Sequence, residues 1–322
     1  MPREITHWKI AEEAAKKLKN TVYEKALLEN RNCLMVGAVF HDCMYYSLKK
    51  AQRSSWADPD ILHGANGEDT YHIIRCILNY CLLQKEGKPG VTAFLVGIIS
   101  HIHADIIFHP LINYFSDNYH SPDKKVRSVS IQIHRRLETL IDIFFCQNME
   151  ETKKYSLNRY LRQCESPISE LLGWMRYNND NKVSSLVIKD YESAFRVFTL
   201  VEFLSKRAFF TEFFVRFERI MPEAIREISA LFYCRWLTDY LPRISGNLKY
   251  KNPTTGVVFL DDLEELFWQS VENTVEMCME LAPFVVDARF INFKHRGPSM
   301  KTGIEGVPAC EMKYFSNERF FV

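Results

Sequence analysis

The sequence has almost no net charge and no linker-like block. Its 322 residues include 41 Lys and Arg against 40 Asp and Glu, so bulk charge gives no reason to expect binding to nucleic acid or to an anionic membrane. With 47% hydrophobic residues, the composition excludes a disordered chain. Since no Gly/Ser/Pro-rich linker separates two halves, we expect one domain over residues 1–288 and an irregular tail over residues 289–322.

Cysteine pairs at metal-binding or redox spacing are absent. The nine cysteines are scattered from Cys33 to Cys310 without a CxxC pair, which argues against a zinc knuckle and against a disulfide framework. The pattern favours reduced thiols that fill the core, as in a cytosolic protein. Residues 1–20 also lack the apolar core of a secretory signal. We therefore expect a cytoplasmic protein.

One apolar run, Ala93–Phe115, is long enough to raise the question of a membrane span, because about 20 apolar residues cross a bilayer. The run contains His101, Asp105 and His109 near its middle, and such residues are costly in lipid. We expect a buried helix here and no transmembrane segment.

Strand signals are few, and helical periodicity dominates. Apolar residues recur at three- and four-residue steps in residues 6–30, 69–87, 128–148 and 262–286, which is typical of amphipathic helices. The sequence predicts an all-α multi-helix bundle, with a site in residues 1–142 and additional C-terminal helices in residues 151–288. Because Phe and Leu at helical spacing are usually buried, the aromatic residues between 193 and 236 are expected in the core.

Histidine is missing from residues 151–285, whereas nine of the ten histidines lie within the first 134 residues. The polar chemistry is therefore concentrated in the first part of the chain. Residues four apart on a helix share a face, so His101 and Asp105 should point the same way while His103 points to the other side.

Two further histidines extend this pattern. Pro110 disfavours helical geometry at the preceding residue. His109 is therefore expected at a helix end, where its side chain can reach a neighbouring group of polar residues. On another helix, His134 and Glu138 are four residues apart, and Asp142 follows one turn later. Two helices thus carry a His and a carboxylate at the same spacing.

This spacing suits a metal ion. An imidazole nitrogen and a carboxylate oxygen one helical turn apart can chelate a single ion, and mixed N/O ligation suits zinc or a similar divalent metal. One such pair is usually a hydrogen-bonded core histidine, but two pairs in apolar helices favour a metal site. Further candidates upstream are His7, the pair His41 and Asp42, and His63, for which His72 is the competitor.

The order of these residues resembles the zinc-dependent phospholipase C family. The shared order is Thr-His-x-x-Ile near the N-terminus, Gly-Ala-x-Phe-x-Asp, an isolated His, His-x3-Asp followed by His-Pro, and His-x3-Glu. The resemblance covers about residues 5–142. That family includes bacterial phosphatidylcholine-cleaving enzymes and alpha-toxins, and it is related to the trinuclear zinc nucleases that act on single strands.

The resemblance implies a set of zinc ligands. The first zinc would take Asp42, His63, His101 and Asp105, the second would take His109, His134 and Glu138, and a third would take His7 together with Asp105. In the secreted members, a processed N-terminal Trp completes the third site, whereas this chain begins with MPREITHW. Two zinc ions are therefore expected, and the third stays open.

Bound zinc activates water and polarises a phosphoryl oxygen, so the expected activity is metal-dependent hydrolysis of a phosphoester. The resemblance implies a phospholipase C-like phosphodiesterase with Asp42 as the general base, while His41 and Asp142 would orient ligands. A phospholipid is the favoured substrate class, and nucleic acid is less favoured.

Two alternatives stay open. His41 and Asp42 could belong to an HD-type metal phosphohydrolase, although that interpretation leaves His134 and Glu138 unexplained. The chain could also be a non-enzymatic helical protein with a degenerate metal site. The sequence predicts no oligomeric state.

Overall fold

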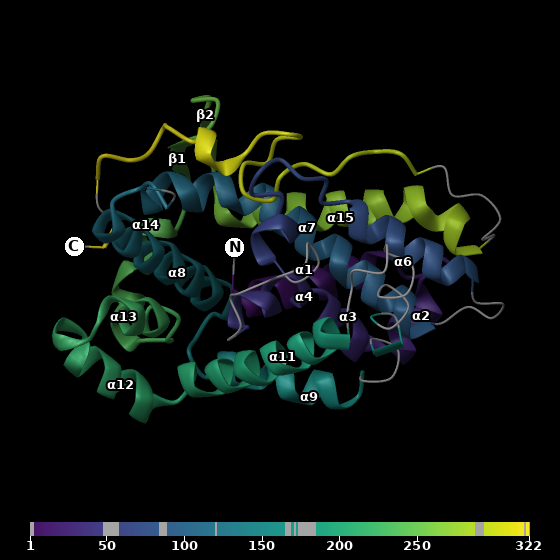
Figure 1. Cartoon of the computed structure of the whole chain (residues 1–322), viewed down its shortest axis with the longest axis horizontal. Coiled ribbons are helices and arrows are strands. Elements are labelled where there is room, and N and C mark those ends of the chain that lie inside the picture. The colour runs from purple at the N-terminus through teal and green to yellow at the C-terminus, as the bar shows by residue number, and fades with distance from the viewer. Residues whose placement is uncertain are drawn as a thin grey trace.

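The computed structural model describes residues 3–47, 58–83, 89–119, 121–164, 169–170, 172, 185–286, 293–318 and 320–321. In this part of the chain, helices make up almost all of the regular structure (Figure 1), which confirms the all-α prediction. The helices are α1 (Glu4–Lys17), α2 (Glu24–Glu29), α3 (Arg31–Gly37), α4 (Phe40–Cys43), α5 (Pro59–Leu62), α6 (His72–Leu83), α7 (Pro89–Ser116), α8 (Lys124–Cys146), α9 (Leu157–Arg162), α11 (Ser185–Ser205), α12 (Ala208–Phe217), α13 (Glu223–Ser229), α14 (Leu241–Ile244) and α15 (Leu263–Val286). The strands β1 (Leu248–Lys251) and β2 (Val258–Asp261) pair antiparallel, with Leu248 opposite Asp261.

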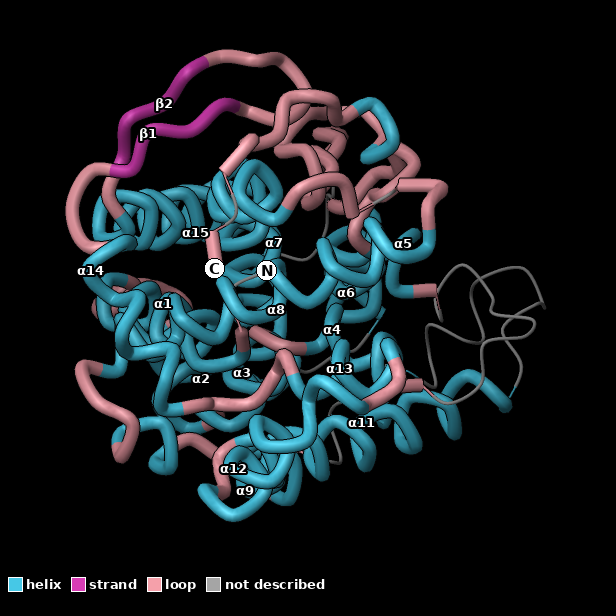
Figure 2. The backbone as a smooth tube through the Cα atoms, turned by 90° about the vertical axis from the view of Figure 1, so that its left-hand side faces the viewer, coloured by secondary structure: helices cyan, strands magenta, loops and turns pink. Residues whose placement is uncertain are grey.

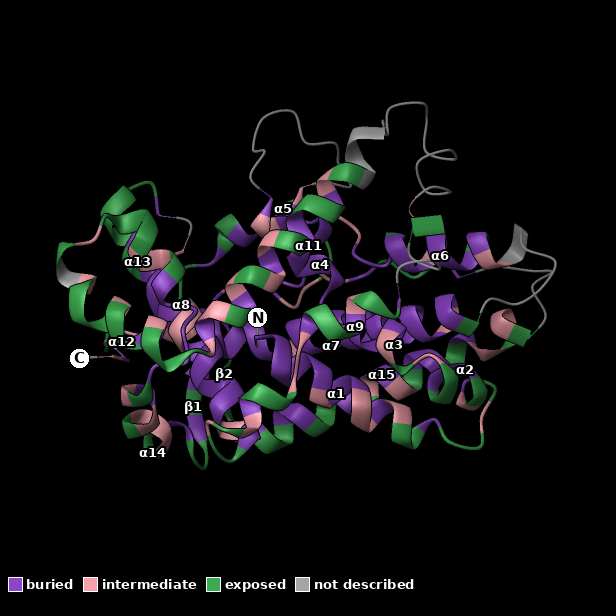
Figure 3. Cartoon of the chain, turned by 90° about the horizontal axis from the view of Figure 1, so that it is seen from below, coloured by how far each residue is buried: buried purple, intermediate pink, exposed green. Residues whose placement is uncertain are grey.

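Helix α7 lies at the centre of the fold, and α1, α2, α3, α6, α8 and α15 pack against it (Figures 1 and 2). Its length and composition alone would allow it to cross a membrane, but 83% of its most apolar 18-residue window is buried inside the protein. A helix that is apolar on every side needs such a cover. Figure 3 shows the buried residues gathered along this centre. This burial agrees with the prediction of a core helix.

Helices α3 and α7 approach each other at two glycines. A Cβ atom at Gly97 would collide with the carbonyl of Leu34, and one at Gly37 would collide with the carbonyl of Phe94. Only residues without a side chain allow the two backbones this approach. The close crossing brings the carbonyl oxygen of Ala38 within 2.9 Å of His101 Nδ1.

Helix α7 continues through Pro110 to Ser116, so the prediction that His109 ends a helix is wrong. Proline removes the hydrogen bond to the carbonyl four residues earlier, which here is that of Ile106. Gly303, from near the C-terminus, packs against this carbonyl. A Cβ built on Gly303 would lie 3.1 Å from the Ile106 oxygen. The position that Pro110 leaves without a donor is thus covered by a distant part of the chain.

The first turn of α1 is capped by Asp142, a residue of α8. The Asp142 carboxylate accepts hydrogen bonds from the main-chain N–H of Ile5 at 3.1 Å and of Thr6 at 2.9 Å. It also accepts from the hydroxyls of Thr6 at 2.6 Å and Tyr233 at 2.7 Å. Because the first N–H groups of a helix have no partner within it, this contact fixes α1 against α8. Asp142 therefore positions the helix that carries His7.

Two other expectations from the sequence need correction. Cys33 in α3 forms a disulfide with Cys164, which follows α9, so this pair is not reduced core filler. The other seven cysteines are free thiols.

The aromatic residues between 193 and 236 are only partly in the core. Phe198 is buried, whereas Phe209 on α12 is 74% exposed, and Figure 3 shows α12 and α13 largely exposed.

Candidate metal centre

The residues predicted as metal ligands converge in the interior between α1, α4, α7 and α8. They form three groups in which the candidate ligand atoms lie within 4.8 Å of one another. The groups are His7, His101 and Asp105; Asp42, His63 and His101; and His109, His134 and Glu138. His63, not His72, lies in this cluster; His72 is on the exposed side of α6 with its Nε2 3.7 Å from Cys76 Sγ.

Asp105 lies between the first two groups. Its Oδ1 is 3.4 Å from His7 Nε2, and its Oδ2 is 3.4 Å from His101 Nε2 and 3.6 Å from His63 Nε2. These distances exceed those of good hydrogen bonds. They match the separation of roughly 3.3 Å between two ligands that each lie about 2 Å from a tetrahedral zinc ion. One oxygen of Asp105 thus faces His7, and the other faces His63 and His101.

Several polar atoms of these groups are buried without a hydrogen-bond partner in the described structure. They include both ring nitrogens of His7, Oδ1 of Asp42, Nε2 of His101 and both carboxylate oxygens of Asp105. Burying such atoms without partners is costly. One or more cations among them would satisfy most of these atoms, and nitrogen and carboxylate donors suit zinc. The residues present therefore fit the implied metal.

Three of the candidate histidines are oriented through Nδ1. Because each Nδ1 faces a main-chain oxygen, it carries the proton and donates, so Nε2 is the nitrogen that would bind a metal. These bonds run from His63 to Pro59 at 2.6 Å, from His101 to Ala38 at 2.9 Å and from His109 to Met300.

The third group combines α7 with one turn of α8. His134 Nε2 lies 2.8 Å from Glu138 Oε1, as the spacing of four residues predicts. The ring of His109 is 5.7 Å from that of His134, measured between centroids. Ser116, at the end of α7, places its hydroxyl 3.4 Å from His134 Nδ1. The α7–α8 contact thus assembles this group.

Burial keeps most of these imidazoles neutral. It lowers the pKa of His134 to about 4 and holds the pKa values of His7 and His109 below the usual value. For Asp105, burial opposes ionisation, but the neighbouring His101 imidazole holds its pKa well below the usual range. His101 is the exception, because Asp105 and Asp42 outweigh burial and raise its pKa. Neutral nitrogens beside ionised carboxylates are the forms that bind metals.

His41 and His103 lie beside these groups without belonging to any of them. The His41 ring stacks on that of His101, with 4.8 Å between centroids and 7° between planes. His41 is fully buried, and neither ring nitrogen has a hydrogen-bond partner in the described structure. His103 projects from another side of α7 towards Tyr71, as its helical phase predicts.

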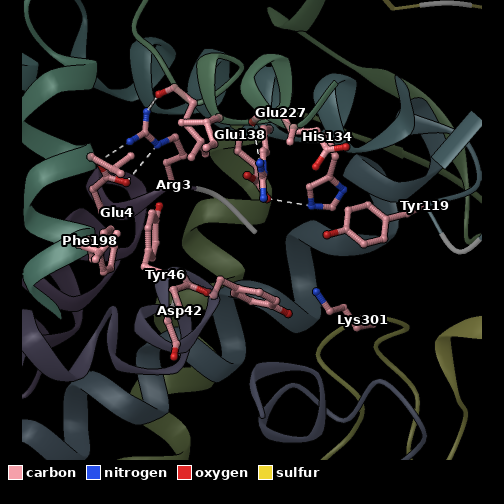
Figure 4. A pocket seen from close by; sticks show the side chains of 18 residues that line it. Arg3, Glu4, Asp42, Tyr46, Tyr119, His134, Glu138, Phe198, Glu227 and Lys301 are labelled. Carbon is pink, nitrogen blue, oxygen red and sulfur yellow. Dashed lines mark hydrogen bonds and ion pairs between the residues drawn. The ribbon is translucent and has the colours of Figure 1, made fainter. Parts of the chain in front are cut away.

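A cavity of about 400 Å³ opens beside these groups. Asp42, His134 and Glu138 line it (Figure 4). Tyr119 and Lys301 also line it, and sequence reasoning missed both. Neither residue lies in a periodic motif or at a ligand spacing, so the sequence holds no local signal for them.

Comparison with known proteins identifies a family for this chain. The profile of the family described as zinc dependent phospholipase C matches residues 6–184, which is more than half of the chain. The human phosphatidylinositol-glycan-specific phospholipase D is 33% identical over 89 residues. That match covers 28% of this chain but only 10% of the human protein. No solved structure matches the chain.

The family match includes the chain segments that supply all three groups. Their order along the chain, His7, Asp42, His63, the α7 residues and then the α8 pair, is the order on which the resemblance rests. The match favours this interpretation over an HD-type phosphohydrolase. The chain therefore belongs to the zinc-dependent phospholipase C family.

Proposed function

We propose that the chain is a zinc-dependent phosphoester hydrolase that cleaves a phosphodiester of a phospholipid. The observation that carries this proposal is the set of buried, unpartnered ligand atoms around Asp105, next to an open cavity. When bound, zinc supplies a Lewis acid that polarises a phosphoryl oxygen and lowers the pKa of water. We propose two zinc ions, with the group of His7, His101 and Asp105 as the candidate for a third.

Asp42 is the proposed general base. Its Oδ1 lies 3.3 Å from His63 Nε2 and 4.0 Å from His101 Nε2. The side chain is 10% exposed and lines the cavity, so it reaches both the metal ligands and a molecule in the pocket. A carboxylate in this position can take a proton from an attacking water.

The cavity suits a molecule with a polar and an apolar part. Asp42, His134 and Glu138 line its polar side, while Val201 and Leu231 contribute an apolar wall. A phospholipid presents this combination at the junction of its headgroup and its glycerol. This wall supports a phospholipid substrate over nucleic acid.

Metal analysis combined with a substrate panel tests the proposal. Purified protein should contain at least two zinc equivalents and should hydrolyse phosphatidylcholine or phosphatidylinositol vesicles in preference to single-stranded DNA. Diacylglycerol as the lipid product indicates cleavage of the phospholipase C type, whereas phosphatidic acid indicates the phospholipase D type named for the human relative.

The matched control is a His101→Ala/His134→Ala variant, which should lose zinc and activity together. Zinc without activity on any phosphoester would favour the non-enzymatic alternative, and a folded protein without zinc would overturn the proposal.

A further inference from the structure

A C-terminal loop, residues 297–307, lies against the metal-ligand elements although it is outside the family match. Met300 is fully buried, its N–H donates to the carbonyl of His63 at 2.9 Å, and its own carbonyl accepts from His109 Nδ1. The next residue, Lys301, accepts at its carbonyl from the Asn113 side chain at 2.9 Å. The loop is therefore bonded on both sides to the segments that carry candidate ligands.

This loop places the ammonium group of Lys301 in the cavity (Figure 4). Lys301 is only 7% exposed, which is unusual for lysine. Its Nζ lies over the rings of Tyr45 and Tyr119, at 5.2 and 5.9 Å from their centroids. No carboxylate or hydrogen-bond acceptor pairs with it among the described residues. A buried ammonium group that has no counterion among the described residues is costly.

The other cations of the cavity wall are already engaged. Arg3 pairs with Glu4 at 2.8 Å, and Arg135 donates to the main-chain oxygen of Glu227 at 2.6 Å. Lys301 therefore differs from both of them. Among the described basic residues of the wall, it is the one whose charge is directed to the contents of the cavity.

The ammonium group also faces the third ligand group. The ring of Tyr119, under Lys301, is 5.4 Å from that of His134, and His134 and Glu138 line the same cavity. An anion between Lys301 and this group would meet a positive charge on one side and the candidate metal on the other. Ammonium groups form charge-assisted hydrogen bonds with phosphoryl oxygens.

We propose that Lys301 is a substrate-binding residue that pairs with a phosphoryl anion in the cavity, and that the C-terminal loop is this chain's own contribution to substrate recognition. The proposal rests on the proposed function, because it takes the substrate to be a phosphoester. The phosphoryl group is either the one that is cleaved or a further phosphate on the headgroup, and the two are separated by experiment.

The test measures binding of inorganic phosphate to the zinc-loaded full chain, from the concentration dependence of its thermal unfolding midpoint. Lys301→Met should weaken phosphate binding by about 10- to 100-fold, as expected for loss of a charged hydrogen bond, and Lys301→Arg should restore most of it. Lys313→Met is the matched control, because Lys313 lies over Tyr314 at 5.4 Å in the same C-terminal region but is exposed.

Kinetics on two lipids show whether Lys301 binds the phosphoryl group that is cleaved or a further phosphate on the headgroup. If Lys301 binds the cleaved group, Lys301→Met should lower kcat/KM equally for phosphatidylinositol and phosphatidylinositol 4-phosphate. If it binds a headgroup phosphate, only the second lipid should lose kcat/KM, through a raised KM.

Unchanged phosphate affinity in a Lys301→Met protein with full zinc content overturns the proposal and leaves the proposed function intact. A wild-type chain that binds no zinc overturns the proposed function. The same comparison of phosphate affinity in that metal-free chain then decides the role of Lys301 separately.

Discussion

At the scale of single residues, Asp105 has the central position in the site. One of its oxygens faces His7 and the other faces His63 and His101. Both oxygens are buried without a hydrogen-bond partner in the described structure. The carboxylate therefore needs a nearby cation to offset the cost of burying its charge.

Replacing Asp105 by Asn therefore tests the site with little change of shape. The amide loses the negative charge and one acceptor, so we expect loss of zinc and a fall in hydrolytic activity greater than the 10- to 100-fold typical of residues that only support ligands. Zinc content by mass spectrometry and kcat on the best lipid substrate measure the two effects. His103→Ala, on another side of the same helix, should retain its zinc, and an Asp105→Asn protein with full zinc content would contradict the assignment.

The buried histidines also predict acid sensitivity of the metal-free protein. Burial lowers the pKa of His134 to about 4 in the fold, whereas an unfolded chain titrates near 6.5. Between these values the unfolded state binds more protons. The stability that the neutral imidazole contributes is therefore fully present above about pH 6.5 and is lost as the pH falls towards 4. His7 and His109 act in the same direction, and His101, with its raised pKa, acts in the opposite one.

Urea unfolding of chelator-treated protein should therefore give a lower free energy of unfolding at pH 5 than at pH 7. A His134→Gln variant should show a shallower dependence. Equal stability at both pH values would mean that the imidazoles are not held neutral.

At the scale of elements, the crossing of α3 and α7 sets the geometry of His101. Gly97→Ala would push the two backbones apart and should destabilise the fold by roughly 1 to 3 kcal/mol, as overpacking does. Because the crossing also supplies the Ala38 carbonyl to His101, zinc affinity should fall as well. Thr92→Ala, on a partly exposed position of α7, is the control. A Gly97→Ala protein as stable as the control would contradict the close packing.

Local sequence patterns predict some of the contacts between these elements but not those that join distant parts of the chain. Helical spacing correctly placed His134 beside Glu138, because a repeat of four residues is a local property of the backbone. Pro110 misled the prediction, because the carbonyl it leaves without a donor is covered by Gly303, which no local pattern connects to it. Lys301 was missed for the same reason, since the contacts that place it in the cavity join residues far apart in sequence.

At the scale of the whole molecule, the disulfide joins distant parts of the chain. Cys33 and Cys164 are 131 residues apart, and closing so long a loop typically stabilises a protein by roughly 2 to 5 kcal/mol. Cys164→Ser should lower the free energy of unfolding by about this amount under oxidising conditions, and reductant should do the same to the wild type. The exposed Cys310 provides the control variant, Cys310→Ser.

Whether the Cys33–Cys164 disulfide forms in the natural protein also indicates the cellular compartment in which the protein is found. A cytoplasmic location stays a prediction, and a disulfide is more typical of an oxidising compartment. Peptide mass mapping of the natural protein without reductant decides between the two, because a cytoplasmic chain should yield free Cys33 and Cys164.

Helix α7 has a consequence for how the molecule is made. Helix α15, which packs along it, follows it in the chain only after α8, α9 and α11 to α14. Until then, a helix apolar enough to enter a lipid bilayer is incompletely covered and exposed to chaperones, membranes and other nascent chains. Chains that stop before Leu263 should therefore aggregate or associate with membranes during translation, whereas chains that extend through α15 should not.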